Sequence, residues 1–257
     1  MSKVFALALA CLFACVLAGP AAAQTLDAHH LECVAAVYPP FTDEKNGVVS
    51  GLGVDLLKEA GRRSGLEIIV KTLPFARIEA ELKRGTESTV ACAYAFGRTA
   101  VREAYMLFTT VPLATTAYLL YAKAPRSAVA YTGTDALKGA RIGVRTAFVV
   151  PDVLARAAAR GELTLDYGRE DELNFRKLAL DRLDYVLANQ DVGSTMIRRL
   201  ALAEVHAVQP PVSEFPTFIV LKKSLALAVP WRDAIDKGLA SLRTGPFERQ
   251  IREQYLR

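Results

Sequence analysis

The chain has 257 residues, 52% of them apolar, with 32 basic and 27 acidic side chains and a net charge of +5. Because the basic residues are scattered along the chain, the modest positive charge indicates a solvated surface and argues against a nucleic-acid-binding protein. The length allows one large domain or two domains of about a hundred residues each.

The N-terminal segment 1–23 has the order of a secretory signal peptide. It carries an early cation at Lys3, an apolar stretch that ends at Val16, the turn-forming pair Gly19-Pro20 and three alanines before Gln24. A retained membrane anchor would need about 20 apolar residues, and Gly19-Pro20 interrupts this stretch too early. We therefore expect cleavage after residue 23 and export of a soluble mature protein to the periplasm.

From residue 31 onward, short apolar runs alternate with helical periods, which is typical of an α/β fold with a parallel sheet. Residues 43–51 are polar and turn-like. The first series predicts strands at 31–37, 66–71 and 89–94 and helices at 54–64 and 75–82.

A second series begins after the threonine-containing segment 112–117. It predicts strands at 118–122, 141–145, 163–167, 185–188 and 218–221, helices at 151–160 and 172–181, and two C-terminal helices around Trp231 and Phe247.

The two series predict two lobes, the first formed by 24–114 plus 216–257 and the second by 115–215. Two hinge crossovers, at 114–117 and 212–215, would connect them around a central cleft. Ligands of α/β proteins collect at the carboxyl ends of the strands, so candidate site residues are expected there.

Two cysteines, Cys33 and Cys92, remain after the expected cleavage. Each lies in an apolar, strand-like run. An oxidising compartment permits a disulfide between them, and the alternative is a pair of buried free thiols that act as small hydrophobic side chains.

The motif Tyr38-Pro39-Pro40-Phe41 directly follows the first predicted strand. Its prolines stiffen the strand exit, so the aromatic rings are held at the lip of the sheet. The rings would form either an aromatic wall for a ligand or a strand end capped by core aromatics.

The motif Gly97-Arg98-Thr99-Ala100-Val101-Arg102 follows the third predicted strand. A strand exit that leads into a helix start offers backbone N–H groups to an anion, and an arginine there can bind a carboxylate through two parallel hydrogen bonds. Arg98 or Arg102 is therefore a candidate carboxylate ligand. The alternative is an arginine on a solvated helix.

Several short motifs follow one another along nearly the whole mature chain. They are Tyr38-Pro39-Pro40-Phe41, Gly51-Leu52-Gly53-Val54-Asp55-Leu56, residues 82–85, Thr99-Ala100-Val101-Arg102, residues 137–144, residues 183–186 and Leu221-Lys222-Lys223. In this order they resemble the bacterial extracellular solute-binding proteins, family 3. The resemblance implies a two-lobed periplasmic-binding-protein fold of type II. It also implies capture of a small carboxylate-bearing solute, an amino acid or a related organic acid, for an ABC permease in the inner membrane.

The same resemblance implies roles for individual residues. Tyr38 would be the aromatic wall, Phe75 a second cleft aromatic, and Arg102 the partner of the ligand carboxylate. Arg77 is similar to a family variant with an extra arginine near the cleft, and its alternative is a surface position beside the interlobe opening.

Three positions depart from the family pattern. Asn189 stands where the family has an aspartate that accepts hydrogen bonds from an α-ammonium group, and an amide supplies no charge. Arg145-Thr146-Ala147-Phe148 replaces a small hydroxyl turn and leaves Thr146 as its only hydroxyl, while Gly97 replaces a serine or threonine. We therefore expect a neutral or anionic solute to be preferred over lysine- or arginine-like cations.

The sequence lacks the usual motifs of nucleophilic and metal-dependent hydrolases. We expect no catalysis, no cofactor, no metal and no nucleic-acid partner, and a monomer. Two alternatives remain. The first is a periplasmic dehydratase-type enzyme on the same fold, with Glu172 or Asp191 as a lone acid or base. The second is a ligand-sensing accessory of a membrane receptor or kinase.

Overall fold

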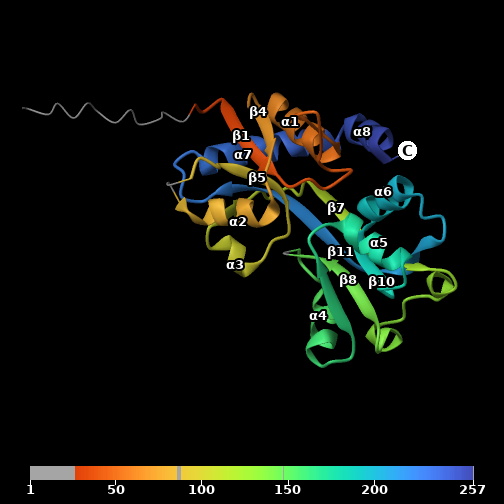
Figure 1. Ribbon diagram of the computed structural model, residues 1–257. Coiled ribbons are helices and arrows are strands. Elements are labelled where there is room, and N and C mark those ends of the chain that lie inside the picture. Colours follow the sequence, from red (N-terminus) through yellow and green to blue (C-terminus); the bar gives the residue numbers. More distant parts are fainter. Residues whose placement is uncertain (1–26, 86–87, 147, 257) are drawn as a thin grey trace, which may run out of the picture.

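The computed structural model describes residues 27–85, 88–146 and 148–256. They form two α/β lobes, the upper and lower bodies of Figure 1. The predicted signal peptide, 1–23, lies outside the described residues. In the described ranges, no helix has the length and apolar character that crossing a bilayer requires.

The first lobe is built on a mainly parallel sheet. Its strands are β1 (His30–Ala35), β4 (Glu67–Thr72), β5 (Cys92–Phe96), β6 (Met106–Phe108) and the C-terminal part of β11 (Val205–Lys222). They run in the order β4-β1-β5-β11, with β6 also paired to β11. Along β1, Leu31 and Cys33 enter one hydrophobic core and Val34 enters the core on the opposite face, as expected for a parallel strand covered on both sides.

Helices cover both faces of this sheet, as Figure 1 shows. They are α1 (Leu52–Arg63), α2 (Phe75–Lys83), α3 (Ala100–Glu103), α7 (Ala228–Arg243) and α8 (Phe247–Leu256). Helices α1 and α7 pack closely, because a Cβ atom at Gly238 would come within 2.0 Å of the Ala60 carbonyl oxygen. Only glycine permits this approach.

The second lobe carries the other half of the sheet, in the order β7-β10-β8-β9. Its strands are β7 (Ala114–Lys123), β8 (Arg141–Arg145), β9 (Thr164–Gly168) and β10 (Tyr185–Asn189), and its helices are α4 (Asp152–Ala159), α5 (Asp171–Ala179) and α6 (Gln190–Leu200). Helix α4 packs in a core of this lobe alone, whereas α5 and α6 pack in the hydrophobic cluster that also contains Leu31 and Cys33 of the first lobe.

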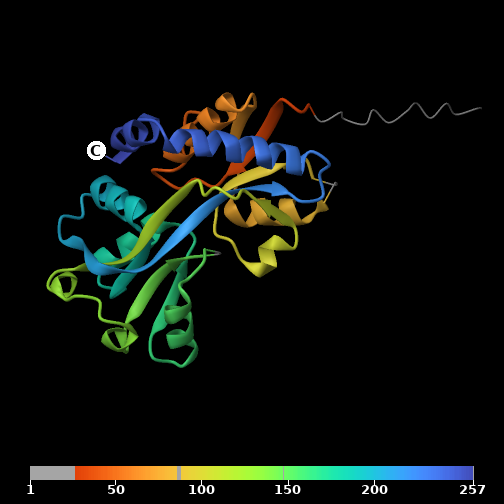
Figure 2. The ribbon, with the colours of Figure 1, turned by 180° about the vertical axis from the view of Figure 1, so that it is seen from behind.

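The two predicted crossovers lie side by side in one antiparallel ribbon. Strands β7 and β11 pair from Lys123 with Val205 to Ala114 with Thr217, with a register shift between Val208 and Ser213. Figure 2 shows this pair passing from one lobe to the other. The short strand predicted at 218–221 is therefore the end of a much longer one.

A second prediction also needs correction. The segment 43–51 was expected to be turn-like, but it forms the hairpin β2 (Asp43–Lys45) and β3 (Val48–Ser50). The turn residues Asn46 and Gly47 both have positive φ, as such a tight hairpin requires.

The two cysteines form a disulfide. Cys33 of β1 and Cys92 of β5 are direct partners in the parallel register, and their sulfur atoms are bonded. Of the two alternatives that the sequence left open, the structure has the bond. It ties together two central strands of the first lobe.

Candidate ligand-binding site

The candidate site lies where strand ends of the two lobes meet. Residues that follow β1 and β5 in the first lobe face residues that follow β8 in the second. They enclose a narrow cavity of about 20 Å³ lined by Tyr38, Phe75, Ala95, Gly97, Arg102, Tyr118, Phe148, Val149, Phe215 and Thr217. Because side chains from both lobes close around it, the structure represents a closed cleft.

Aromatic side chains from both lobes interlock in this cavity. The Phe148 ring of the second lobe lies 5.0 Å from the Tyr38 ring and 5.1 Å from the Phe75 ring of the first. Tyr38 also stacks on Phe41, at 5.8 Å between centroids. The structure thus brings Tyr38 and Phe75, the two residues expected to form an aromatic wall, into one cavity.

Two buried tyrosines, Tyr38 and Tyr118, line the cavity. Burial raises the pKa of the Tyr38 hydroxyl well above its ordinary value, and burial raises the pKa of Tyr118 to about 12. Both hydroxyls are therefore neutral at physiological pH. They offer a ligand hydrogen bonds and no charge.

Arg102 is the arginine that the fold places in the cavity. It is 7% exposed, and the hydroxyl of Thr99 caps its short helix by accepting a hydrogen bond from the Arg102 backbone N–H. Its guanidinium lies over the rings of Phe75 and Phe96, 5.6 and 5.2 Å from their centroids. Nη1 donates to the Gly97 carbonyl.

The carboxylate of Glu79 lies beside the Arg102 guanidinium. Nε of Arg102 lies 3.5 Å from Oε1 of Glu79, which also accepts a hydrogen bond from the Tyr105 hydroxyl at 2.6 Å. A guanidinium has five N–H donors. A ligand carboxylate at Arg102 would share or exchange the contacts that this side chain makes now.

The other two candidate arginines lie outside the cavity. Arg98 donates to the Thr109 carbonyl and pairs with Glu103, and its side chain is 42% exposed. Arg77 is 65% exposed on α2 and lies 3.7 Å from Glu81. Of the three arginines, only Arg102 lines the cavity.

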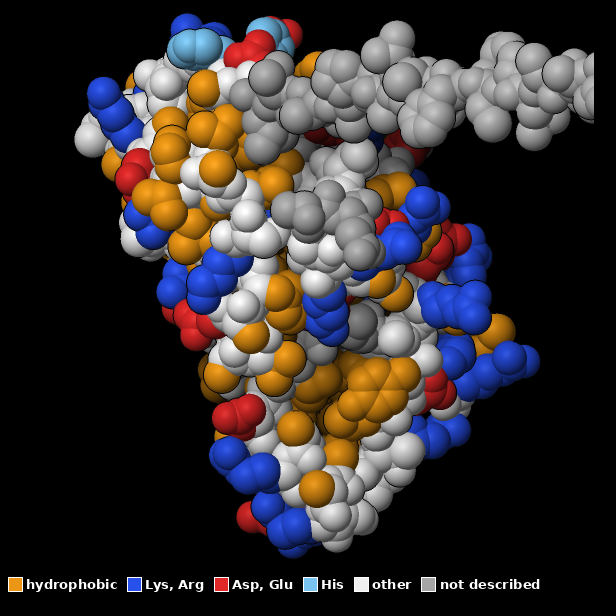
Figure 3. Space-filling model, turned by 90° about the vertical axis from the view of Figure 1, so that its left-hand side faces the viewer, with side chains coloured by type: hydrophobic (Ala, Val, Ile, Leu, Met, Phe, Trp, Pro, Cys, Tyr) orange, Lys and Arg blue, Asp and Glu red, His pale blue; other side chains and the backbone are white. Residues whose placement is uncertain are grey.

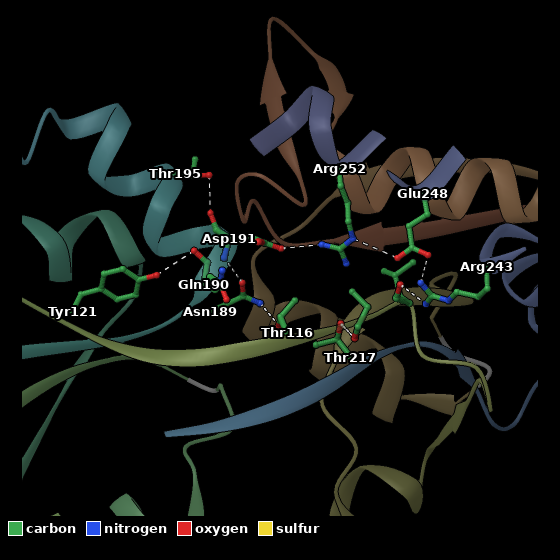
Figure 4. A network of polar contacts seen from close by, with 12 residues as sticks. Thr116, Tyr121, Asn189, Gln190, Asp191, Thr195, Thr217, Arg243, Glu248 and Arg252 are labelled. Atoms are coloured by element: carbon green, nitrogen blue, oxygen red, sulfur yellow. Dashed lines mark hydrogen bonds and ion pairs between the residues drawn. The ribbon is translucent and has the colours of Figure 1, made fainter. Parts of the chain in front are cut away.

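Asn189 is buried at the end of β10, where its side chain serves the protein itself. Its Oδ1 accepts from the Asp191 backbone N–H at 2.9 Å and so caps helix α6, while its Nδ2 donates to the Thr116 hydroxyl. Figure 4 shows these contacts beside an ion pair of Asp191 with Arg252 of α8. Because Oδ1 of Asn189 already accepts the Asp191 N–H, an ammonium group would have to share this acceptor.

Thr146 is exposed and turned back on its own lobe. Its hydroxyl and its backbone N–H both donate to the Gly168 carbonyl, at 3.1 and 2.8 Å. It lines a wider cavity of about 640 Å³ at the cleft mouth, together with Phe75, Arg145 and Arg169. Figure 3 shows apolar side chains gathered around the hollow between the lobes.

Sequence reasoning missed two buried charged residues of the cleft. Arg145, 9% exposed, donates from Nη1 to Oδ2 of Asp171 at 2.8 Å and from Nη2 to the Val37 carbonyl at 2.9 Å. Burial raises the pKa of Asp171, and the charge of Arg145 opposes that rise. The sequence signal for this pair was Arg145 itself. The motif Arg145-Thr146-Ala147-Phe148 was interpreted only as the replacement of a small hydroxyl turn.

Two further features concern the rest of the described surface. A larger and more open hollow, of about 1010 Å³, lies along the edge strand β4 and the β2–β3 hairpin, away from the strand ends that build the cavity. Among the described residues, no group of three or more His, Cys, Asp or Glu side chains could hold a metal ion. The cleft itself offers a small molecule aromatic contacts, hydrogen-bonding groups and a guanidinium charge.

Two α/β lobes joined by a two-stranded ribbon and closed over a largely aromatic cavity are the architecture of a periplasmic-binding-protein-like fold. The family model of the bacterial extracellular solute-binding proteins, family 3, matches residues 32–257. The chain belongs to this family, which confirms the resemblance found in its motifs.

Solved structures share the fold at low sequence identity. An ancestral arginine-binding protein bound to arginine has a TM-score of 0.74 and 19% identity, over 89% of this chain and 99% of that one. A histidine kinase sensor domain with similarity to periplasmic binding proteins has a TM-score of 0.75 and 18% identity, over 90% of this chain and 98% of that one. An ancestral amino-acid-binding protein, a precursor of cyclohexadienyl dehydratase, has a TM-score of 0.69 and 15% identity, over 89% of this chain and 96% of that one. A comparison with curated proteins finds no match.

Proposed function

We propose that this chain is a periplasmic binding protein that captures a small carboxylate-bearing solute, an amino acid or a related organic acid, and delivers it to an ABC permease. The observation that supports this most is the position of Arg102, a buried guanidinium on two aromatic rings at the wall of an interlobe cavity. A guanidinium can bind a carboxylate through two parallel hydrogen bonds. The protein would act as a monomer.

Lobe closure would follow the division expected from the sequence, 24–114 plus 216–257 against 115–215. The β7–β11 ribbon would absorb the backbone change while each lobe moves as a rigid body. In its middle, Thr116 pairs with Phe215 and Ala117 with Glu214. These positions lie within the two predicted hinge crossovers.

The charges of the cleft favour a neutral or anionic solute. Arg102 and Arg145 are both buried, their carboxylate neighbours Glu79 and Asp171 already have these arginines as partners, and the amide of Asn189 adds no charge. An additional cation in the closed cleft would lack an ionised partner, which costs several kcal/mol.

A thermal-shift screen of the mature protein with amino acids, dicarboxylates and small organic acids would find the solute. A ligand at a hundred times its Kd adds about 2.7 kcal/mol of stability.

Arg102→Ala should weaken binding of the identified solute at least tenfold, because losing a buried charge-assisted pair costs about 2–5 kcal/mol. The matched control is Arg77→Ala, which removes an exposed arginine of the same lobe. Equal affinities of wild type and Arg102→Ala, measured by calorimetry, would contradict the proposal.

A sensory role is the second candidate, and the fold shared with a histidine kinase sensor domain supports it. Capture of the solute would be the same in both roles. Deleting the gene should reduce uptake of the identified solute if the protein serves a permease. Normal uptake with a lost transcriptional response to the solute would favour sensing.

A further inference from the structure

The second lobe presents its own guanidinium to the aromatic wall of the first. We propose that Arg145 is a built-in occupant of the cleft, which fills a cation-binding slot formed by Tyr38, Phe148 and Asp171. In this position it latches the lobes together and excludes cationic side chains of solutes. The latch is independent of the proposed function, and only the consequence for solute choice rests on that function.

The slot has the parts that recognise a guanidinium. The Cζ atom of Arg145 lies 4.9 Å from the ring centroid of Tyr38 and 4.8 Å from that of Phe148. Nη1 is 2.8 Å from Oδ2 of Asp171 and Nη2 is 2.9 Å from the Val37 carbonyl oxygen. Two aromatic faces, a carboxylate and a carbonyl oxygen are the favoured environment of this planar cation.

These partners divide between the two lobes. Asp171 and Phe148 belong to the same lobe as Arg145, so these contacts are compatible with an open cleft. The Val37 carbonyl and the Tyr38 ring belong to the other lobe. Opening the cleft would remove Arg145 from both, so the guanidinium would lose one hydrogen bond and one aromatic contact. Arg145 therefore stabilises the closed arrangement without a solute.

The same geometry explains how a cationic solute is kept out. A free guanidinium or ammonium group would need the rings and the carboxylate that Arg145 already occupies. Arg145 is tethered to the slot, and a tethered group acts at an effective concentration on the order of millimolar or more. A solute cation would have to displace it, whereas an uncharged or anionic solute at Arg102 would not.

The test is chemical rescue of Arg145→Ala with methylguanidinium. Removal of the side chain leaves the rings and Asp171 as an unfilled slot. We expect the variant to bind methylguanidinium chloride at least tenfold more tightly than methylammonium chloride at equal ionic strength, with a concentration-dependent rise in unfolding temperature. Wild type and the control Arg141→Ala, an exposed arginine on the same strand that pairs with Asp184, should show no such rise. The double variant Arg145→Ala, Asp171→Asn should lose the rescue.

Small-angle scattering tests the latch separately. Solute-free Arg145→Ala should have a larger radius of gyration than wild type, and methylguanidinium should reduce it. If the alanine variant does not fold, Arg145→Gln, which keeps most of the side-chain volume, takes its place in the scattering measurement. Equal radii would overturn the latch, and equal binding of methylguanidinium by wild type and variant would overturn the slot. Neither result would affect the solute test on Arg102.

Discussion

Each lobe contributes one buried arginine to the cleft, and the two arginines have similar surroundings. Each guanidinium lies over two aromatic rings and beside one carboxylate. The partners are Phe75, Phe96 and Glu79 for Arg102, and Tyr38, Phe148 and Asp171 for Arg145. The same three kinds of group thus occur twice, once around the arginine of each lobe.

The difference between them lies in which lobe supplies the partners. The two rings and the carboxylate beside Arg102 all belong to the first lobe, so its environment does not require closure. Arg145 reaches from the second lobe to the Val37 carbonyl and the Tyr38 ring of the first. Arg102 can therefore keep its partners in an open and in a closed cleft. Arg145 makes two contacts that exist only when the cleft is closed.

The largest expected effect comes from removing the carboxylate of the second lobe. Asp171→Asn leaves the Arg145 guanidinium buried with no ionised partner, which costs about 3–5 kcal/mol of unfolding free energy. Glu79→Gln should cost less than about 1 kcal/mol, because the Glu79 carboxylate is more exposed and 3.5 Å from Nε of Arg102, against 2.8 Å for the Asp171 pair. Urea unfolding of both variants measures the difference. Equal losses would show that the two sites are energetically equivalent.

Much of the fold could be predicted from the sequence because the relevant patterns are local. Alternating apolar runs and helical periods located β8 at 141–145, as observed, and placed α1, α2, β4 and β10 within a few residues. The long strand β11 was missed over most of its length because it contains Pro210, Pro211 and Pro216, which remove backbone donors. The ladder tolerates them through an irregular register between Val208 and Ser213.

The site was predicted less completely, because it depends on contacts between distant residues. Tyr38, Phe75 and Arg102 were predicted from motifs at strand ends and from the family resemblance, and they do line one cavity. The role of Arg145 depends on Val37, 108 residues away in the sequence. No local pattern could show that the guanidinium crosses between the lobes.

The second expected effect comes from removing a covalent bond that lies within the first lobe. The Cys33–Cys92 disulfide joins β1 and β5 beneath the Arg102 site, across a sequence separation of 59 residues. Replacing both cysteines by alanine should cost about 2–4 kcal/mol of unfolding free energy. Hydrogen exchange should become faster in β1 and β5 while β8, which carries Arg145, keeps its protection. Equal acceleration in both lobes would show that they unfold as one unit and would weaken the contrast drawn between their arginines.

The smallest effect is a pH dependence confined to the first lobe. Burial alone would raise the pKa of Glu79, but the hydrogen bond from the Tyr105 hydroxyl and the charge of Arg102 outweigh it, so the pKa lies below its usual 4.5. The unfolded state then binds more protons in that range, and the stability that Glu79 contributes is present above pH 4.5 and is lost as the pH falls through the lowered pKa.

This direction of the pH dependence can be tested by comparing wild type with Glu79→Gln. At about pH 6 the wild type should be more stable, by less than about 1 kcal/mol for a partly exposed pair, and the difference should vanish as the solution is acidified below the lowered pKa. Tyr105→Phe removes the donor to Glu79 and should flatten the dependence in the same direction. A stability difference that stayed constant across this range would mean that Glu79 acts by packing rather than by its charge. The carboxylate beside Arg102 would then offer little competition to a ligand carboxylate.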